Sequence, residues 1–172
     1  EYVIPNELLD LESKIRKLKI FRCDEDYGSH TKIIPTLQRI NDDETIIVTW
    51  DDDLVYHPNT LKHHRDAQER IPNSAIGFAG MGARDRDIHF VSSTVDDIVP
   101  VNILEGYKSS SYKRNFFSDA YYELSRLYWD DDLIISGCLC DRNIHKSVIS
   151  WNNELIGGKG VHHQIVPIHF GG

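Results

Sequence analysis

Three consecutive aspartates, Asp51, Asp52 and Asp53, directly follow an apolar stretch and are the clearest candidates for chemistry in the sequence. Carboxylates a few ångströms apart raise one another's pKa, so such a cluster is costly unless a cation or hydrogen bonds relieve the repulsion. Alternate side chains of an extended segment share a face, so Asp51 and Asp53 can converge on an ion while Asp52 points elsewhere. Oxygen ligands favour a hard cation, and the pattern predicts a Mg²⁺ or Mn²⁺ site; the alternative is a solvated acidic turn.

The elements on either side indicate where this cluster lies. Residues 45–50 form a β-branched run that is typical of a strand buried on both faces of a parallel sheet. A shorter apolar stretch, residues 19–23, predicts a strand that ends in a second acidic segment, residues 24–26. Open α/β sheets bind ligands at the carboxyl ends of their strands. We therefore expect both acidic segments at the same edge of one sheet.

The rest of the chain predicts alternating strands and helices. Helices are expected over residues 6–17, 29–40, 59–69 and from 116 onward, strands over 75–80, 89–92 and 99–104, a helix or strand over 133–140, and a mobile loop with a short tail over 157–169. No repeat or low-complexity linker divides the sequence. We expect residues 1–172 to form a single-domain α/β fold, an open mixed but mostly parallel sheet flanked by helices.

Composition excludes several classes of protein. The 172 residues are 40% hydrophobic, which is enough for the core of one domain. The formal net charge of −8 argues against a nucleic-acid or anionic-membrane binder. No apolar stretch approaches the roughly 20 residues of a membrane span, and no signal peptide begins the sequence. The cysteines, expected to be reduced thiols, indicate a cytoplasmic protein.

Several motifs, taken together and in order, resemble a known family. They comprise residues 23–32 with their Asp-Glu-Asp-Tyr-Gly-Ser segment, residues 46–58 with the three aspartates, residues 104–107 and 112–114 around Glu105 and Gly106, and residues 129–137, which begin Trp-Asp-Asp-Asp. This order resembles the nucleotide-sugar glycosyltransferases of the Rossmann-like GT-A fold, and in particular the small enzymes encoded by chloroviruses. Residues 51–53 stand as the Asp-x-Asp motif of that family.

The resemblance implies an activity and its partners. It implies transfer of a sugar from a nucleoside-diphosphate sugar, a UDP-sugar such as UDP-glucose, with Mn²⁺ or Mg²⁺ as the cofactor. The acceptor is a glycan, including one on a viral structural glycoprotein, and a viral enzyme would act in the host cytoplasm. The family begins with a strand that supplies part of the base-binding pocket, and we expect this sequence to start after it.

The resemblance also implies roles for individual residues. Asp53 and Asp51 hold the metal, and His169 or His163 completes the metal site or contacts the diphosphate. Contacts with the nucleotide sugar are implied for Asp24, Asp26, Lys32, Asp51, Asp52, Glu105 and Gly106. Asp131 or Asp132 contacts the acceptor hydroxyl and, in an inverting enzyme, is the catalytic base. Trp129 beside them can stack on a sugar.

Each of these roles has a structural alternative. Asp24 and Asp26 can cap a helix, Lys32 can be a solvated helix residue, and residues 130–132 can complement a helix N-terminus without any function. The three-aspartate motif after an apolar strand also fits a haloacid-dehalogenase-like phosphohydrolase that uses Asp51 and Asp53, although a βα unit ahead of the nucleophile strand argues against it. A nucleotide-sugar binding domain without turnover is the non-enzyme alternative.

Overall fold

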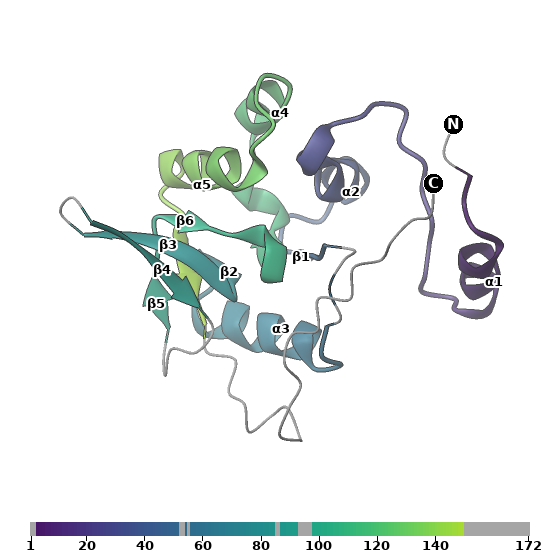
Figure 1. The fold of residues 1–172 in the computed structure, drawn as a ribbon, viewed down its shortest axis with the longest axis horizontal. Coiled ribbons are helices and arrows are strands. Elements are labelled where there is room, and N and C mark those ends of the chain that lie inside the picture. Colours follow the sequence, from purple (N-terminus) through teal and green to yellow (C-terminus); the bar gives the residue numbers. More distant parts are fainter. Residues whose placement is uncertain (1–2, 52–53, 55, 85–86, 93–97, 150–172) are drawn as a thin grey trace.

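The computed structural model describes residues 3–51, 54, 56–84, 87–92 and 98–149. They form a mixed α/β structure in which a five-stranded sheet has helices on both faces (Figure 1). The strands lie in the order β1 (Ile46–Thr49), β7 (Ser110–Lys113), β2 (Ser74–Gly77), β8 (His145–Val148) and β5 (Val99–Pro100). A second sheet of three strands has the order β4 (Asp87–Ser92), β3 (Ala79–Arg84) and β6 (Ile103–Leu104).

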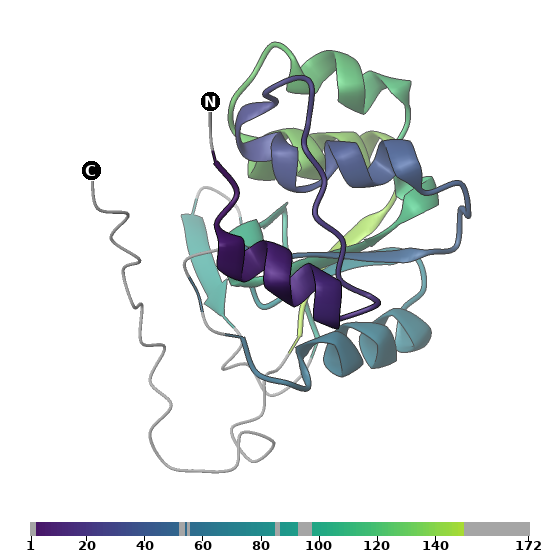
Figure 2. The ribbon, with the colours of Figure 1, turned by 90° about the vertical axis from the view of Figure 1, so that its right-hand side faces the viewer.

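Helices cover the two faces of the larger sheet unequally. The helices of the described residues are α1 (Asn6–Lys14), α2 (Ile34–Arg39), α3 (Thr60–Arg70), α4 (Asp119–Ser125) and α5 (Asp131–Asp141). Short 3₁₀ turns are η1 (Gly28–Lys32), η2 (Gly106–Lys108) and η3 (Arg114–Phe116). Helix α1 buries none of its residues. Figure 2 shows α3 on one side of the sheet and α2, α4 and α5 on the other. None of the helices in the described ranges is both long and apolar enough to cross a membrane.

The core is divided by the sheet in the same way. The larger cluster lies under α2, α4 and α5 and includes Ile34, Leu104, Tyr121 and Leu139, all of them fully or almost fully buried. The smaller cluster joins Ala67 of α3 to Ile76 of β2, together with Phe78 and Ile149. Burial on both faces explains why every residue of β2, the central strand, is buried.

The prediction of a mostly parallel sheet is wrong. Strands β2 and β8 are parallel, but β7 lies between β1 and β2 and is antiparallel to both, and β5 is antiparallel to β8. The sequence of β7 begins with two serines, Ser110 and Ser111, which are fully buried. Hydropathy does not predict a buried strand from serine, so β7 was not expected.

The structure confirms some of the other predicted helices and strands and contradicts others. Helices α1 and α3 and strand β1 lie where they were expected, and residues 133–140 belong to helix α5. Residues 19–23 are not a strand: they are largely exposed, and Phe21 is 61% exposed. The apolar runs 75–80 and 99–104 are each divided between the two sheets, because the chain passes from β2 to β3 and from β5 to β6. The helix expected from residue 116 begins at Asp119. Residues 157–169 lie outside the described residues.

Candidate functional site

The side chain of Lys32 joins two of the predicted acidic segments. Its Nζ lies 3.0 Å from Oδ1 of Asp51 and 3.0 Å from Oδ2 of Asp131. Asp51 follows the carboxyl end of β1, Lys32 ends η1, and Asp131 lies in the first turn of α5. Strands β1 and β2 are both antiparallel to β7, so they run in the same direction and the site lies at their carboxyl edge.

Buried hydrogen bonds hold η1, and therefore Lys32, in place. His30 is completely buried, with Nε2 donating to the carbonyl of Tyr128 at 3.0 Å and Nδ1 lying 3.0 Å from the hydroxyl of Tyr121. Thr31 accepts a hydrogen bond from the backbone N–H of Tyr27 at 3.1 Å. These contacts fix the turn between α4 and the sheet, so Lys32 points toward the carboxylates.

The first turn of α5 presents the second acidic pair. Asp130 is the N-cap residue, and its carboxylate accepts from the backbone N–H of Leu133 at 2.9 Å, which satisfies a donor that the helix leaves unpaired. This capping role is the structural alternative for Asp130. It leaves Asp131 and Asp132 to face the site.

Asp132 contacts the turn η2 directly. Its Oδ1 accepts a hydrogen bond from the backbone N–H of Gly106 at 2.9 Å. A Cβ atom on Gly106 would lie 3.1 Å from this oxygen and 3.3 Å from Nζ of Lys32, so the glycine allows the backbone to approach the carboxylate closely. Gly106, for which the sequence predicts a contact with the nucleotide sugar, therefore contacts Asp132 through its main chain.

The site shifts the proton affinity of Lys32 and Asp132. Burial alone would lower the pKa of Lys32, but its hydrogen bond with Asp51 and its close ion pairs with Asp51 and Asp131 outweigh burial and raise it. Burial raises the pKa of Asp132 to about 6, and the negative charges of Asp131 and Glu105 act in the same direction. The hydrogen bond from Gly106 and the charge of Lys32 oppose this rise. Asp132 therefore titrates close to neutral pH.

Asp131 has fewer hydrogen bonds to its carboxylate than Asp130 and Asp132 have. Its Oδ2 atom is buried and lies within ion-pair distance of Lys32, but it has no aligned hydrogen bond within the described part of the chain. An ion pair without an aligned hydrogen bond compensates the desolvation of a carboxylate only in part. This atom can therefore gain a further donor when a ligand binds.

A buried polar network supports η2 from the side of α3. Ser109, which ends the turn, has a φ of 98°, and its hydroxyl lies 2.8 Å from Nε2 of His64. The other ring nitrogen of His64 lies 2.9 Å from the hydroxyl of Ser111. Burial lowers the pKa of His64 to about 3, so the ring is neutral at pH 7. The network stabilises the unfavourable backbone conformation of Ser109 at the end of the turn that begins at Gly106.

An aromatic pair borders Asp51. The rings of Trp50 and Tyr56 stack with their centroids 5.0 Å apart. The Tyr56 oxygen accepts the backbone N–H of Asp51 at 2.9 Å and donates to the carbonyl of Tyr107 at 3.3 Å. Tyr56 thus connects the end of β1 to η2.

Most of the predicted site residues with described positions do come together. Lys32, Asp51, Gly106, Asp131 and Asp132 are in direct contact or linked through one another, and Glu105 acts on Asp132 through its charge. The structural alternative for Lys32, a solvated helix residue, does not hold, because its side chain is only 22% exposed. Its predicted contact with the nucleotide sugar stays a prediction.

The remaining predicted residues are not in this cluster. Asp26 accepts a hydrogen bond from the backbone N–H of Gly28 at 2.8 Å, as a turn-capping residue does, and Asp24 is exposed. Asp52, Asp53, His163 and His169 lie outside the described residues. His64 and Ser109 were not predicted, and neither the hydrophobic pattern nor a motif distinguishes them.

Of the residues predicted to hold a metal ion, the structure describes only Asp51, whose Oδ1 is paired with the ammonium group of Lys32. Within the described ranges, no three His, Cys, Asp or Glu side chains form a group that could hold a metal ion. Mg²⁺, however, commonly binds through one or two carboxylates and the phosphates of its substrate, without a complete protein cage. Asp51 supplies one such carboxylate at the edge where the Asp-x-Asp motif begins.

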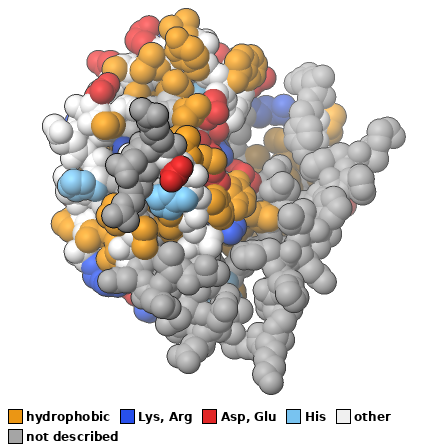
Figure 3. Space-filling view, turned by 60° about the vertical axis from the view of Figure 1, so that its left-hand side comes forward, with side chains coloured by type: hydrophobic (Ala, Val, Ile, Leu, Met, Phe, Trp, Pro, Cys, Tyr) orange, Lys and Arg blue, Asp and Glu red, His pale blue; other side chains and the backbone are white. Residues whose placement is uncertain are grey.

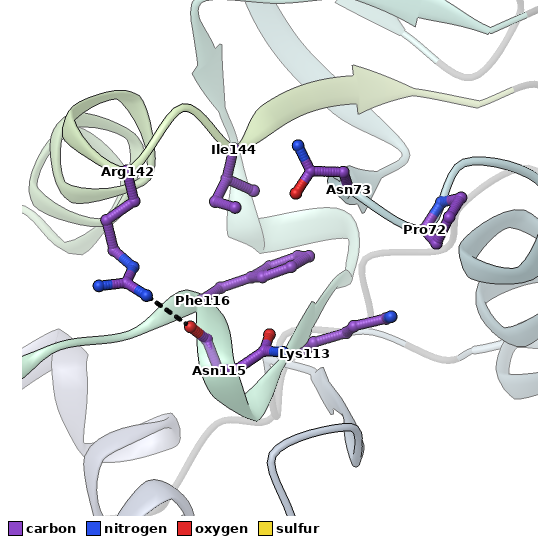
Figure 4. Close-up of a pocket in the computed structure, with 7 residues that line it drawn as sticks. All are labelled: Pro72, Asn73, Lys113, Asn115, Phe116, Arg142 and Ile144. Carbon is purple, nitrogen blue, oxygen red and sulfur yellow. Dashed lines mark hydrogen bonds between the residues drawn. The ribbon is translucent and has the colours of Figure 1, made fainter.

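One cavity in the described part of the chain lies away from this cluster. It has a volume of about 250 Å³ and is lined by Asn73, Phe116, Arg142 and Ile144, among others (Figure 4). Arg142 donates to the carbonyl of Asn115 at 3.1 Å. Asn73 and Ile144 precede β2 and β8, so the cavity lies at the amino edge of these strands, and it contains none of the predicted site residues.

Comparison with protein-family models gives no match for this chain, and comparison with curated proteins gives none either.

Proposed function

We propose that this chain is a metal-dependent glycosyltransferase with a GT-A-like fold, which transfers a sugar from a nucleoside-diphosphate sugar to a hydroxyl of a glycan. The observation that carries the proposal is the pairing of Lys32 with both Asp51 and Asp131 at the carboxyl edge of β1. This pairing joins the Asp-x-Asp segment to the second acidic motif, as one active site requires. Open α/β sheets bind their ligands at this edge.

Asp132 is the better candidate for the catalytic base of the acidic pair. A pKa of about 6 leaves its carboxylate mostly ionised at pH 7, yet still basic enough to accept a proton. Asp131, by contrast, is paired with the ammonium group of Lys32. In an inverting reaction the acceptor oxygen attacks the anomeric carbon, its proton passes to Asp132, and the bond from the sugar to the diphosphate breaks.

In this proposal, Lys32 and the Asp-x-Asp segment bind the donor diphosphate. The ammonium group of Lys32 can contact a phosphate oxygen, since a lysine in a partly buried site binds phosphate as a point charge. Asp51 and Asp53, with His169, would hold the metal. When bound, Mn²⁺ or Mg²⁺ stabilises the charge that develops on the departing nucleoside diphosphate.

The resemblance to chlorovirus enzymes extends the proposal to the partners. It favours a uridine donor, contacts from Asp24 or Asp26 to the base or ribose, and a glycan acceptor, including one on a viral structural glycoprotein. It also favours action in the cytoplasm.

Calorimetric titration with UDP, GDP and CDP, each with and without Mn²⁺, tests the donor site. We expect UDP to bind the wild-type chain only with metal, and Asp51→Asn and Asp53→Asn each to weaken binding about tenfold or more. Asp119→Asn is the control for these variants and matches Asp132→Asn most closely, because Asp119 and Asp132 both lie in the first turn of a helix and Asp119 is outside the site. Asp132→Asn should keep nucleotide binding and lose transfer.

Each other outcome has a defined meaning. A folded wild-type chain that binds none of the three nucleotides would contradict the proposal. Release of phosphate from p-nitrophenyl phosphate, lost in Asp51→Asn, would identify a phosphohydrolase instead. Metal-dependent UDP binding without transfer from any UDP-sugar to any glycan would leave a nucleotide-sugar binding domain.

A further inference from the structure

The indole of Trp129 is an exposed, rigidly backed surface next to the acidic motif. Trp129 is 77% exposed, although tryptophan, the largest side chain, is normally largely buried. Its ring lies against Gly28, where an added Cβ would be 2.5 Å from Cε3 of the indole. Gly28 has a φ of 57°, so the backbone conformation and the close approach both favour glycine there.

Hydrogen bonds fix the backbone that carries this ring. The hydroxyl of Ser29 donates to the carbonyl of Trp129, and the completely buried His30 donates to the carbonyl of Tyr128 at 3.0 Å. The exposed indole is therefore held in place before any ligand arrives. A pre-ordered aromatic surface loses little conformational entropy on binding.

A cleft of about 190 Å³ lies beside the ring, between residues 25–27 and the segment that joins α4 to α5. Glu25, Asp26, Arg126 and Tyr128 line it with Trp129. Glu25 and Arg126 face each other at 3.6 Å and are both about half-exposed, so they offer an acceptor and a donor at the same place. One oxygen of Asp26 accepts the backbone N–H of Gly28.

This combination matches the chemistry of a neutral saccharide. A pyranose has an apolar C–H face that packs on an aromatic ring, and a rim of hydroxyls that donate to carboxylates and accept from guanidinium groups. The two carboxylates of the cleft repel a phosphate group, which argues against the nucleotide diphosphate as its occupant. We propose that the Trp129 cleft, whose lining includes these five residues, binds the neutral glycan that accepts the sugar. Asp26 then serves the acceptor, and of the two aspartates proposed to contact the base or ribose, Asp24 is the one left to the donor.

The position of the cleft agrees with this role, which rests on the proposed transferase function. Trp129 precedes Asp131 by two residues, so their Cα atoms are at most about 7 Å apart. A sugar ring packed on Trp129 therefore lies close to the carboxylates at the start of α5.

Ligand-observed NMR with a panel of methyl glycosides and neutral disaccharides of glucose, galactose, mannose, xylose, fucose and rhamnose tests the proposal without any catalysis. Uronic-acid disaccharides serve as the charged comparison. We expect at least one neutral sugar to show saturation transfer, and Trp129→Ala to weaken its binding about tenfold. Trp129→Phe keeps a flat ring and should restore part of the binding. Leu127→Ala is the matched control, because Leu127 is 70% exposed but does not line the cleft.

The outcomes separate this proposal from that of the donor site. Absence of binding by every neutral sugar, or equal binding in Trp129→Ala and the wild type, would overturn it. Loss of UDP binding in Trp129→Ala would overturn it as well, because the ring would then hold the nucleotide base. Trp129-dependent sugar binding in a chain that binds no nucleotide would support the cleft and contradict the transferase.

Discussion

The titration of Asp132 gives the reaction a defined pH dependence. Because the base must be ionised to accept a proton, kcat/KM should rise with pH through about 6 and then level off. Asp132→Asn should lower kcat by roughly 10²- to 10⁴-fold, while retaining an oxygen for the Gly106 N–H. Measuring kcat/KM from pH 4.5 to 8.5 checks this, with Asp119→Asn as the control. A profile that falls between pH 5 and 7 would refute Asp132 as the base.

The same carboxylate should lower the stability of the fold at neutral pH. Its folded pKa lies above the usual value, so the folded state binds a proton more tightly than the unfolded chain does. The contribution of Asp132 to stability is therefore complete below about pH 4 and is lost as pH rises through about 6. We expect Asp132→Asn to raise the free energy of unfolding at pH 7 by about 1–2 kcal/mol, after allowing for solvent screening. Urea denaturation at pH 4 and 7 should show this gain at pH 7 only.

Lys32 holds together charges that repel each other without it. We expect Lys32→Met to lower the free energy of unfolding by about 1–3 kcal/mol, because it leaves Asp131 partly desolvated without its cation. Lys62→Met is the control, since the ion pair of Lys62 with Asp66 is solvent-exposed and should contribute less than about 1 kcal/mol. Equal effects of the two variants in chemical denaturation would show that the Lys32 contacts are no stronger than a surface pair.

At the scale of elements, the turn η2 depends on a backbone conformation that serine rarely adopts. Ser109→Ala and Ser109→Gly both remove the hydroxyl that contacts His64, but only glycine adopts a φ of 98° without strain. We expect both variants to be destabilised, and Ser109→Ala to be about 1 kcal/mol less stable than Ser109→Gly. Thermal and urea unfolding of the pair check this. A more stable alanine variant would mean that the turn relaxes when the hydroxyl is lost.

The elements that could be predicted are those that bury hydrophobic side chains in a regular pattern. Strand β1 and helix α3 follow from regular hydrophobic patterns, and the structure places them where those patterns do. Strand β7 could not be found in this way, because its buried serines satisfy their hydroxyls with polar partners such as His64. The strand expected over residues 19–23 fails for the opposite reason: an apolar side chain such as Phe21 can lie exposed on the surface.

At the scale of the molecule, the sequence predicted several of the residues that meet, but it did not predict the contacts between them. The carboxyl edge of β1, with Asp51 at its end, follows from the general behaviour of α/β sheets. That Lys32 lies between Asp51 and Asp131 depends on the packing of η1 against α4 and α5, which no local pattern encodes. The pKa of Asp132 likewise depends on burial under η2. The roles of Asp52, Asp53 and His169 stay predictions.

The net negative charge of the whole molecule is compatible with the proposed ligand, a nucleoside-diphosphate sugar. Figure 3 shows acidic side chains interspersed with hydrophobic ones on one face of the molecule, in keeping with the formal net charge of −8. Such a surface repels polyanions over a distance set by salt, whereas a diphosphate can still bind where Lys32 and a metal provide positive charge.

The placement of β7 between β1 and β2 has a consequence for the newly synthesised chain. Both neighbours of β7 are complete before residue 110 leaves the ribosome, and each then presents an unpaired edge to the solvent. The N-terminal portion of the chain therefore exposes two strand edges until β7 has been synthesised, and edge-to-edge aggregation of nascent chains can occur during this interval.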